Sequence, residues 1–394
     1  MKKLYMILPL AALGLSSCGI DGSYTGEMYD PDSRLEAPYD IDWNAAADSV
    51  DNVLTSRFMD PEKGTFWIIN DNVDPGLSTY AYWPQAHAMD VIVDAYLRIR
   101  DTDAERAAEY ENYMRLWHQN RAHNYNSPDY YNAYTDDMEW IVMTLLRMYE
   151  ATNVQEYLTY AKQTYDDWII TRWSDDENGG GIRWSLDAAN SKNACSNGPG
   201  AICAMRLYEF TRDEKYLDDA KRIYGWLSAT LYNSSTGAVA DNMSGGNVNG
   251  GALSYNQGTF MGAAHMLYKA TGDLKYKTEA VKAAEYQMDN MTTDGIMNSE
   301  TGTANSDNAL FKGIFIRYAV LMANDEESFD AGFRKELADF ITHNAITAWT
   351  EGIDKSEGSD MFFNYDWTTP YNEFYGYLQP QVSGSTLIEA MTRL

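Results

Sequence analysis

The amino-acid sequence predicts an all-α fold, a barrel of six helical hairpins of the (α/α)6 type. Apolar residues recur at helical spacing along most of the chain, and no stretch shows the sustained alternation of a strand. Twelve helical segments alternate between nearly apolar and amphipathic, and a weak internal repeat accompanies them. An open helical solenoid is the alternative, but it would not need six fully apolar helices.

The periodicity places the twelve helices in six pairs. We expect them at about residues 44–58, 82–100, 103–122, 136–152, 154–172, 193–211, 213–231, 255–271, 274–291, 308–323, 328–348 and 381–393. The segments at 136–152 and 308–323 are apolar nearly all round, so they should be buried on every side. Those at 213–231 and 274–291 carry one charged face and should lie outside. Six buried helices inside six amphipathic ones would form two concentric rings.

The internal repeat marks the turn from a buried helix to an amphipathic one. Its three instances are Thr152-Asn153, Thr211-Arg212-Asp213 and Thr271-Gly272-Asp273. In each case a Tyr and an Ala follow at matching positions of the next helix. The buried helices begin roughly 55–75 residues apart, which is too long for tetratricopeptide repeats.

Composition and charge limit the possible partners. The chain has 394 residues, with 30 Lys and Arg against 58 Asp and Glu, a net charge of −28. A hydrophobic fraction of 45% rules out a disordered chain. The acidity argues against nucleic acid or an anionic membrane surface as a partner, because both repel it. Neutral ligands remain possible, and 30 Tyr and 11 Trp form a high aromatic content.

The N-terminus is predicted to be an export signal over residues 1–17. Two lysines precede an apolar run at residues 4–15, which is too short to span a bilayer. The run ends at Leu15-Ser16-Ser17-Cys18-Gly19, which resembles the bacterial lipobox, whose Cys is acylated. An ordinary signal peptide with an incidental Cys is the alternative.

This motif predicts a lipoprotein, with a lipidated Cys18 and a tether over residues 18–40 in front of one helical domain at 41–394. We expect the protein to be anchored to the bacterial cell envelope, at the periplasmic face or the cell surface. The outer membrane is one such location. The protein would touch the membrane only through its lipid. Cys195 and Cys203 remain and could form a disulfide in an oxidising compartment.

Unusual residues gather in the long segments that lead into the buried helices. If these helices are parallel, the segments meet at one end of the barrel and form a cleft there. The candidate ligand-binding residues are Trp83, Tyr134, Gly180, Gly181, Trp184, Asn193, Asn197, Tyr255, Gln257 and Lys312. Aromatic rings beside amides and hydroxyls suit a sugar, which has an apolar face and many hydroxyls. The alternative is that the Tyr and Trp rings simply fill a large helical core.

Asp136 and Asp137 open an otherwise apolar helix. One Asp could be explained as a helix cap, which favours acids. Two acids a few ångströms apart in a cleft raise one pKa, so that one carboxyl stays protonated while the other stays ionised. A retaining glycosidase needs such a pair, one carboxyl as nucleophile and one as acid. Other Asp pairs occur at 166–167, 175–176 and 218–219, so the context rather than the dipeptide carries the prediction.

Other chemistries have less support. The sequence contains no Gly-x-Ser-x-Gly elbow, no Walker loop and no dinucleotide fingerprint. The stretch from Asp176 to Gly180 partly resembles a calcium loop but lacks its closing Glu. Lys312 and Arg317 lie on an apolar helix and need partners. They could pair with acids of the buried helices, or one of them could bind a ligand.

Five sequence pieces together resemble glycoside hydrolase family 76, the bacterial endo-α-1,6-mannanases. The pieces are Tyr134-Thr135-Asp136-Asp137-Met138-Glu139-Trp140, Gly179-Gly180-Gly181-Ile182 with Trp184, Lys192-Asn193-Ala194-Cys195-Ser196-Asn197-Gly198, Tyr255-Asn256-Gln257-Gly258 and Phe311-Lys312-Gly313-Ile314-Phe315. They follow the family's order and cover residues 80–320. The resemblance implies an (α/α)6 barrel, in agreement with the helix count.

The resemblance also implies a retaining, endo-acting hydrolase of α-1,6-mannan backbones. A two-carboxylate mechanism requires no cofactor or metal, and we expect a monomer. Asp136 would be the nucleophile and Asp137 the general acid/base. Arg183 departs from the pattern, because an aromatic residue is expected there.

Three alternative functions stay open. One is a non-catalytic glycan-binding lipoprotein of a carbohydrate uptake system, which would not need two adjacent carboxylates. Another is a glycan transglycosylase on the same fold. A third is a different six-hairpin glycosidase or an unsaturated-uronide hydrolase, which should have a basic cleft.

Overall fold

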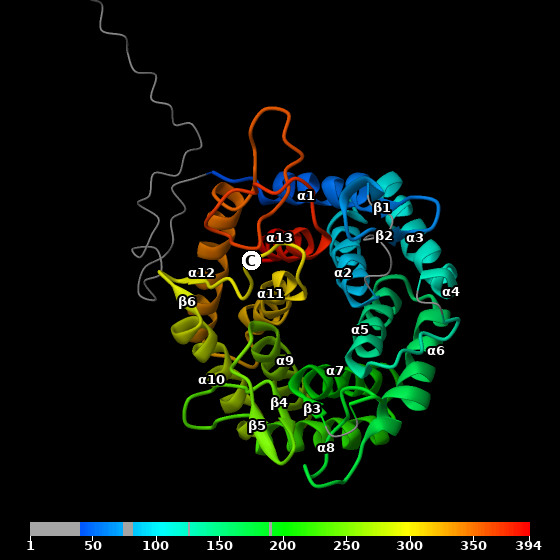
Figure 1. The fold of residues 1–394 in the computed structure, drawn as a ribbon, viewed down its shortest axis with the longest axis vertical. Helices are drawn as coiled ribbons and strands as arrows, with labels where there is room; N and C mark the ends of the chain where they lie inside the picture. The colour runs from blue at the N-terminus through cyan, green and yellow to red at the C-terminus, as the bar shows by residue number, and fades with distance from the viewer. Residues whose placement is uncertain (1–39, 74–81, 125–126, 189–190) are drawn as a thin grey trace, which may run out of the picture.

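Two concentric rings of helices form the protein (Figure 1). The computed structural model describes residues 40–73, 82–124, 127–188 and 191–394. The inner ring consists of α2 (Tyr82–Ile99), α5 (Thr135–Thr152), α7 (Ala194–Thr211), α9 (Ser254–Thr271), α11 (Phe311–Ala323) and α13 (Leu378–Met391). Each inner helix contacts the next one, and α13 contacts α2, so the ring is closed. The predicted (α/α)6 barrel is therefore confirmed, and the open solenoid is excluded.

The outer ring consists of the amphipathic helices. They are α1 (Trp43–Arg57), α3 (Ala104–Gln119), α6 (Gln155–Thr164), α8 (Glu214–Thr230), α10 (Leu274–Asn290) and α12 (Ala331–Thr350). A short helix, α4 (Arg121–Asn124), follows α3. The chain therefore alternates between inner and outer helices, as the charged faces predict.

Two predicted helices differ in detail from the structure. The segment predicted at 154–172 begins as α6 but continues as a π-turn at Tyr165–Ile169 and a 3-10 turn at Ile170–Arg172. The last helix begins at Leu378 rather than at residue 381. Pro380 lies in its first turn, where the missing N–H costs no hydrogen bond, so the proline did not mark the helix start.

Short strands, which the periodicity did not predict, connect several helices. The antiparallel pairs are β1 (Met59–Asp60) with β2 (Thr65–Phe66) and β6 (Thr292–Thr293) with β7 (Ile296–Met297). A three-stranded antiparallel sheet has the order β3 (Ser191–Asn193), β4 (Asn242–Ser244) and β5 (Asn247–Asn249). Because β3 leads directly into α7, this sheet joins the loops in front of α7 and α9.

The repeated hairpin turns share one geometry. Asn153, Arg212 and Gly272 cap α5, α7 and α9 in the left-handed conformation, with φ of 58°, 57° and 71°. Each cap N–H donates to a carbonyl in the last turn of its own helix. The preceding Thr hydroxyl of each repeat donates to a carbonyl four residues earlier.

Close packing fixes the inner ring. Every residue of α13 is buried. A Cβ atom on Gly258 of α9 would lie 2.7 Å from the Cα of Phe315 in α11. One on Gly313 of α11 would lie 2.8 Å from the Cα of Ser383 in α13. At both contacts two backbones meet, so a larger side chain would push neighbouring inner helices apart.

The predicted signal peptide, Cys18 and all but the last residue of the tether lie outside the described residues. Among the helices that the structure describes, none combines the length and the apolar character needed to cross a membrane.

Candidate active site

The N-terminal ends of the inner helices surround a cavity of about 340 Å³. Its lining comes from the starts of α2, α5, α7, α9 and α11 and from the loops before them. The residues are Trp83, Asp136, Trp140, Trp184, Asn193, Cys195, Asp241, Leu253, Tyr255, Asp307, Asn308 and Phe311. Among the described residues, the lining of this cavity therefore combines aromatic rings with three carboxylates and contains no Lys, Arg or His.

Asp136 and Asp137 occupy the first turn of α5, and neither is its N-cap, because Tyr134 holds that position. The start of α5 is attached to a neighbouring loop. The N–H of Thr135 donates to the carbonyl of Trp184 at 2.8 Å, and its hydroxyl donates to the carbonyl of Arg183 at 2.6 Å. The aspartate pair and the Trp184 loop are therefore held together. Neither acid is the N-cap, although both lie in the first turn, where acids suit the helix end.

The carboxylate of Asp136 faces the cavity. Its Oδ2 accepts a hydrogen bond from Nε1 of Trp184 at 3.3 Å. Burial raises the pKa of Asp136 to about 6, although hydrogen bonds from the Cys195 thiol, the Trp184 indole and the helix backbone oppose the rise. At neutral pH this carboxyl is therefore mainly ionised.

The pKa of Asp137 is also raised, and here the neighbouring charges add to the effect of burial. Burial raises the pKa of its carboxyl well above the usual value, and the negative charges of Asp136 and Asp307 raise it further. Asp137 is not among the residues that line the cavity. Two lining residues, Asp136 and Asp307, are close enough to raise its pKa, so it lies at the cavity's edge. One ionised and one protonated carboxyl at the start of one helix can act as nucleophile and acid.

Aromatic rings form one wall of the cavity. The rings of Tyr255 and Phe311 stack with centroids 3.8 Å apart. Trp83 lies 6.3 Å from both Phe311 and Trp140. These rings from α2, α5, α9 and α11 offer an apolar surface on which a sugar could stack.

A second aromatic pair lies on the other side of Asp136. The ring of Tyr134 is 5.1 Å from that of Trp184, and Tyr134 is 43% exposed. Tyr134 does not line the cavity itself, so it lies at the rim beside Trp184. Of the ten predicted ligand-binding residues, Trp83, Trp184, Asn193 and Tyr255 line the cavity.

Asn197 and Gln257 are buried, and their amides bind the backbone. Asn197 accepts from the N–H of Ile182 at 2.8 Å and donates to its carbonyl at 3.0 Å. Gln257 accepts from the N–H of Val239 at 2.6 Å and donates to the carbonyls of Gly237 and Ala283. Their amides are therefore used to hold the loops that carry Trp184 and Asp241, and the structure does not bring them into the cavity.

Gly180 and Gly181 also act through packing. A Cβ on Gly180 would lie 2.4 Å from the ring of Trp173, and one on Gly181 would lie 2.6 Å from the ring of Trp226. Gly181 also has a φ of 102°, which favours glycine. Both residues shape the loop before Trp184, and neither lines the cavity.

The two cations of α11 have different environments. Arg317 pairs with Asp94 at 2.9 Å and with Asp90 at 3.7 Å, so it has the structural partners that the sequence left open. The Nζ of Lys312 lies 4.0 Å above the ring of Trp367 and has no hydrogen-bond partner among the described residues. Lys312 is 2% exposed and lies outside the cavity.

The ammonium group of a lysine from β3 lies inside the loop that partly resembles a calcium site. The Nζ of the fully buried Lys192 donates to the carbonyls of Ser174, Gly179 and Gly180 at 2.5–2.7 Å and pairs with Asp176 at 2.9 Å. The ammonium thus takes the central place among oxygens that the calcium interpretation gave to a metal.

Both remaining cysteines are free and buried, so the possible disulfide is absent. Cys195 lines the cavity beside Asp136.

Sequence reasoning missed several lining residues. Trp140, Cys195 and Phe311 lie inside the quoted motifs, but they were not predicted to bind a ligand. Asp241 lies in an irregular segment, and Asp307 begins a short 3-10 helix at Asp307–Leu310 that is too short for a periodic signal. The rule that segments before inner helices meet at one end could have indicated Asp307, which lies four residues before Phe311. The Asp241 carboxylate accepts from Asn256 at 3.3 Å, and its carbonyl accepts from the N–H of Ala194.

Comparisons with known proteins agree with this geometry. The profile of glycosyl hydrolase family 76 matches residues 42–392. The solved structure of the GH76A α-1,6-mannanase from Salegentibacter sp. HEL1_6 is 34% identical, with a TM-score of 0.78 over 89% of this chain and 98% of that one. An inactive variant of the same enzyme, with two aspartates replaced and α-1,6-mannotriose bound, is 33% identical with a TM-score of 0.79 over 89% of this chain and 99% of that one.

Curated relatives are fungal. A putative mannan endo-1,6-α-mannosidase of Schizosaccharomyces pombe is 29% identical over 57% of this chain and 53% of its own length. A mannan endo-1,6-α-mannosidase of Saccharomyces cerevisiae is 27% identical over 54% of this chain and 50% of its own. The chain thus spans about half the length of these curated relatives.

Proposed function

The chain belongs to glycosyl hydrolase family 76, and we propose on this basis that it is an endo-acting hydrolase of α-1,6-linked mannan. The observation that carries the proposal is the aspartate pair at the start of α5, whose two pKa values are raised to different extents beside an aromatic cavity. Two findings on relatives support this choice of substrate. The inactive Salegentibacter variant has α-1,6-mannotriose bound, and the fungal relatives are named mannan endo-1,6-α-mannosidases.

We propose a retaining mechanism in two steps. The ionised Asp136 attacks the anomeric carbon, while the protonated Asp137 gives its proton to the departing glycosidic oxygen. A mannosyl ester on Asp136 results, and the sugar chain beyond the cleaved bond leaves. Asp137, now ionised, takes a proton from water as that water attacks the anomeric carbon. The ester breaks, and both carboxyls return to their starting states.

The remaining lining residues suit the transition state and the sugar. Positive charge develops on the sugar ring during each step, and the carboxylates of Asp241 and Asp307 lie in the same cavity wall. Asn193 and Asn308 offer amides to the hydroxyls, and Trp83 offers a ring surface. The lining has no cation, so it disfavours the acidic sugars of an unsaturated-uronide hydrolase.

The direct test uses unbranched α-1,6-mannan and separates its products by size. Wild-type protein should yield a ladder of short oligosaccharides, and both Asp136→Ala and Asp137→Ala should abolish it. Asp218→Ala, which removes an exposed carboxylate on α8, is the matched control and should keep full activity. Binding to the mannan without cleavage would contradict the proposal and favour the glycan-binding alternative. Products longer than the substrate would favour the transglycosylase.

We propose in addition that acylated Cys18 anchors the protein to the bacterial cell envelope, at the periplasmic face or the cell surface. The lipobox-like sequence supports this, and the net charge of −28 means that anionic headgroups would repel the domain rather than hold it. Labelled fatty acid should be incorporated by the wild-type chain and not by Cys18→Ala. We also propose that the protein acts as a monomer, which sedimentation of the released domain would test.

A further inference from the structure

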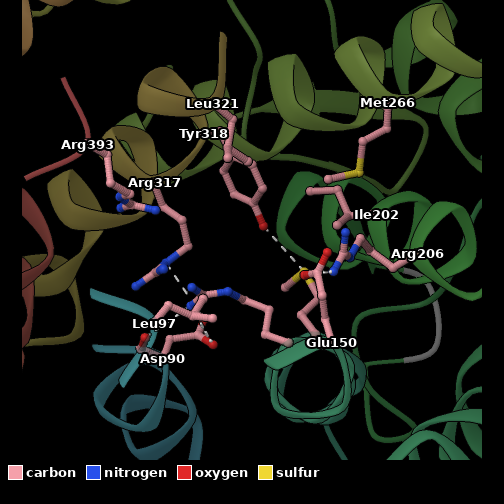
Figure 2. Close-up of a pocket in the computed structure, with 12 residues that line it drawn as sticks. Asp90, Leu97, Glu150, Ile202, Arg206, Met266, Arg317, Tyr318, Leu321 and Arg393 are labelled. Carbon is pink, nitrogen blue, oxygen red and sulfur yellow. Dashed lines mark hydrogen bonds and ion pairs between the residues drawn. The ribbon is translucent and has the colours of Figure 1, made fainter. Parts of the chain in front are cut away.

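A second cavity, of about 250 Å³, lies at the C-terminal ends of the inner helices, at the end of the barrel opposite the aspartate pair (Figure 2). Four of its lining residues are Arg147, Arg206, Arg317 and Arg393. Four arginines around one small cavity are unusual in a chain with a net charge of −28, and neither the proposed reaction nor the comparisons give them a role.

Two of these arginines keep unused hydrogen-bond donors. Arg317 is 7% exposed; its Nη1 donates to Asp94 at 2.9 Å, but its Nη2 has no partner among the described residues. Arg393 contacts Asp94 through Nη1 at 3.4 Å, and its Nε and Nη2 are buried without a partner among those residues. An unsatisfied buried donor costs about 1–3 kcal/mol, more when charged, so such groups usually serve a ligand or water.

A nearby arginine shows what full satisfaction looks like at this end of the barrel. Arg98 on α2 pairs with Asp48 through Nη1, with Asp51 through Nη2 and with Glu389 through Nε, at 2.8–3.1 Å. If Arg317 and Arg393 served only such a structural ion network, each of their side-chain nitrogens would have a partner as well. Their free donors therefore distinguish the cavity from the network beside it.

Charge in the buried cluster is unbalanced in the same direction. Arg147, Arg317 and Arg393 share two carboxylates, Asp90 and Asp94, so one positive charge is left over. Burial lowers the pKa of Arg393, Asp94 counteracts this, and the charges of Arg317 and Arg147 lower it further.

The other charged groups near the cavity already have partners. Glu389 attracts Arg393 and is bound to Arg98 at 3.1 Å. Arg206, across the cavity, is paired with Glu150 and Glu209, whose side chains are 54% and 38% exposed and thus screened by water. At the C-terminal ends of α5, α7 and α9, one carbonyl of each helix accepts from the N–H of its own cap residue.

The opposite wall combines apolar side chains with the ion pair of Arg206 and Glu150. Figure 2 shows Arg317 and Arg393 on one side of the cavity and Ile202 and Met266 on the other. Met143 and Leu321 add to the apolar lining, and the hydroxyl of Tyr318 donates to the sulfur of Met143 at 3.4 Å. A ligand that fits both walls has an anionic group at one end and a compact apolar body at the other.

We propose that this cavity binds a small organic anion, a carboxylate or a phosphate monoester on a compact apolar body. The forks of Arg317 and Arg393 bind the anionic group with the donors that the protein leaves free, as guanidinium groups do with carboxylate and phosphate oxygens. The site is separate from the mannan cavity and does not depend on the proposed function.

Calorimetric titration of the full chain with benzoate, phenyl phosphate and benzyl alcohol tests the proposal. Benzoate or phenyl phosphate should bind with one-to-one stoichiometry, and which of the two binds more tightly identifies the anionic group. Benzyl alcohol, which has the same apolar body without charge, should bind at least about tenfold more weakly. Equal binding of the alcohol, or no binding of either anion, would overturn the proposal.

Arg393→Gln is the test variant, since its side chain is partly exposed and lies one residue from the C-terminus. It should weaken anion binding about tenfold and leave mannan cleavage without added anion unchanged. Arg222→Gln, which breaks an exposed pair on α8, is the matched control and should bind like wild type. If Arg393→Gln fails to fold, Arg393→Lys keeps the charge, loses the fork and should still weaken binding. Wild-type affinity in a folded Arg393 variant would refute the assignment.

Discussion

The two ends of the inner ring are built from the same six helices but hold the Asp136–Asp137 pair, at one end, and Asp94, at the other, in opposite ways. At the N-terminal end, burial raises the pKa of both Asp136 and Asp137, and no Lys, Arg or His lines the cavity to oppose it. At the C-terminal end, burial also acts on Asp94, but the charges of Arg147, Arg317 and Arg393 prevail and hold its pKa far below its usual range.

This contrast separates reactive from structural acids. A buried carboxyl without a cation keeps a high pKa, which suits proton transfer but lowers the stability of the folded state. A buried carboxyl surrounded by guanidinium groups stays ionised and joins helices together. All three acids are aspartates on inner helices, so their neighbours and their position along the helix distinguish the two roles.

The largest expected effect concerns stability. Asp94→Asn leaves three arginines around the remaining carboxylate, and it should lower the free energy of unfolding by about 3–5 kcal/mol. Asp137→Asn removes an unpaired buried carboxyl, and at pH 7 it should raise the free energy of unfolding by about 1 kcal/mol or more. Urea denaturation of the two variants and wild type would measure both. If both variants lost stability equally, the two ends would not differ as described.

The two aspartates should also affect the pH dependence of stability with opposite signs. For Asp137 the folded pKa lies above the unfolded value of about 3.9, so its contribution to stability is lost as the pH rises from about 4 through its folded pKa. For Asp94 the folded pKa lies below that value, so its contribution is lost as the pH falls below about 4. The stability gain of Asp137→Asn over wild type should therefore grow from pH 4 to pH 8.

Activity should show a bell-shaped dependence on pH. Cleavage should fall below about pH 6, as the nucleophile Asp136 becomes protonated, and fall again at high pH as Asp137 loses its proton. Because the pair is coupled, the two limbs report macroscopic values of the dyad. Initial rates of mannan cleavage against pH measure this, and a flat profile from pH 4 to pH 9 would contradict the assigned states.

A smaller effect should follow from the hydrogen bond to the nucleophile. Trp184→Phe keeps an aromatic ring but removes the Nε1 donor to Asp136. We expect kcat/KM to fall about tenfold and the acid limb of the pH profile to move upward, because the ionised form loses a partner. Trp168→Phe, whose Nε1 has no partner among the described residues, is the matched control. An unshifted acid limb would show that Trp184 acts only as a stacking surface.

The smallest effect on activity is expected at Lys312. Burial lowers the pKa of Lys312 to about 7 against the attraction of Asp366 and Glu300. Lys312→Met should leave KM within about twofold and raise the unfolding free energy at pH 7 by about 1 kcal/mol, because an unpaired buried ammonium is removed. The gain should shrink as the pH rises from about 7 towards about 10.4, where the lysine of the unfolded chain also becomes neutral. A large rise in KM would restore Lys312 as a ligand-binding residue.

Sequence reasoning predicted the helices better than the site. Helical periodicity located all twelve barrel helices, because outer helices alternate between charged and apolar faces and inner ones are apolar over most of their surface. The same lack of polarity hid which side of an inner helix faces the cavity. Tyr255 and Gln257 share one motif, yet one lines the cavity and the other binds backbone carbonyls.

Long-range pairing was beyond the sequence as well. Asp241 reaches the cavity through a loop that pairs with residues near Asn193, since Asn193 lies opposite Asn242 in the sheet. No periodicity encodes such a meeting of segments nearly fifty residues apart. The aspartate pair was found because its two charges interrupt an apolar helix, which is a local signal.

The buried ammonium of Lys192 has a further consequence. It binds three carbonyls and a carboxylate of the loop before Trp184, and the next residue, Asn193, lines the cavity. A free ion at such a position would come and go with its concentration, whereas a side chain is present once per molecule in any medium. The loop beside the cavity is thus held by a cation that belongs to the chain itself, so the order of this loop does not depend on the salt concentration around the protein.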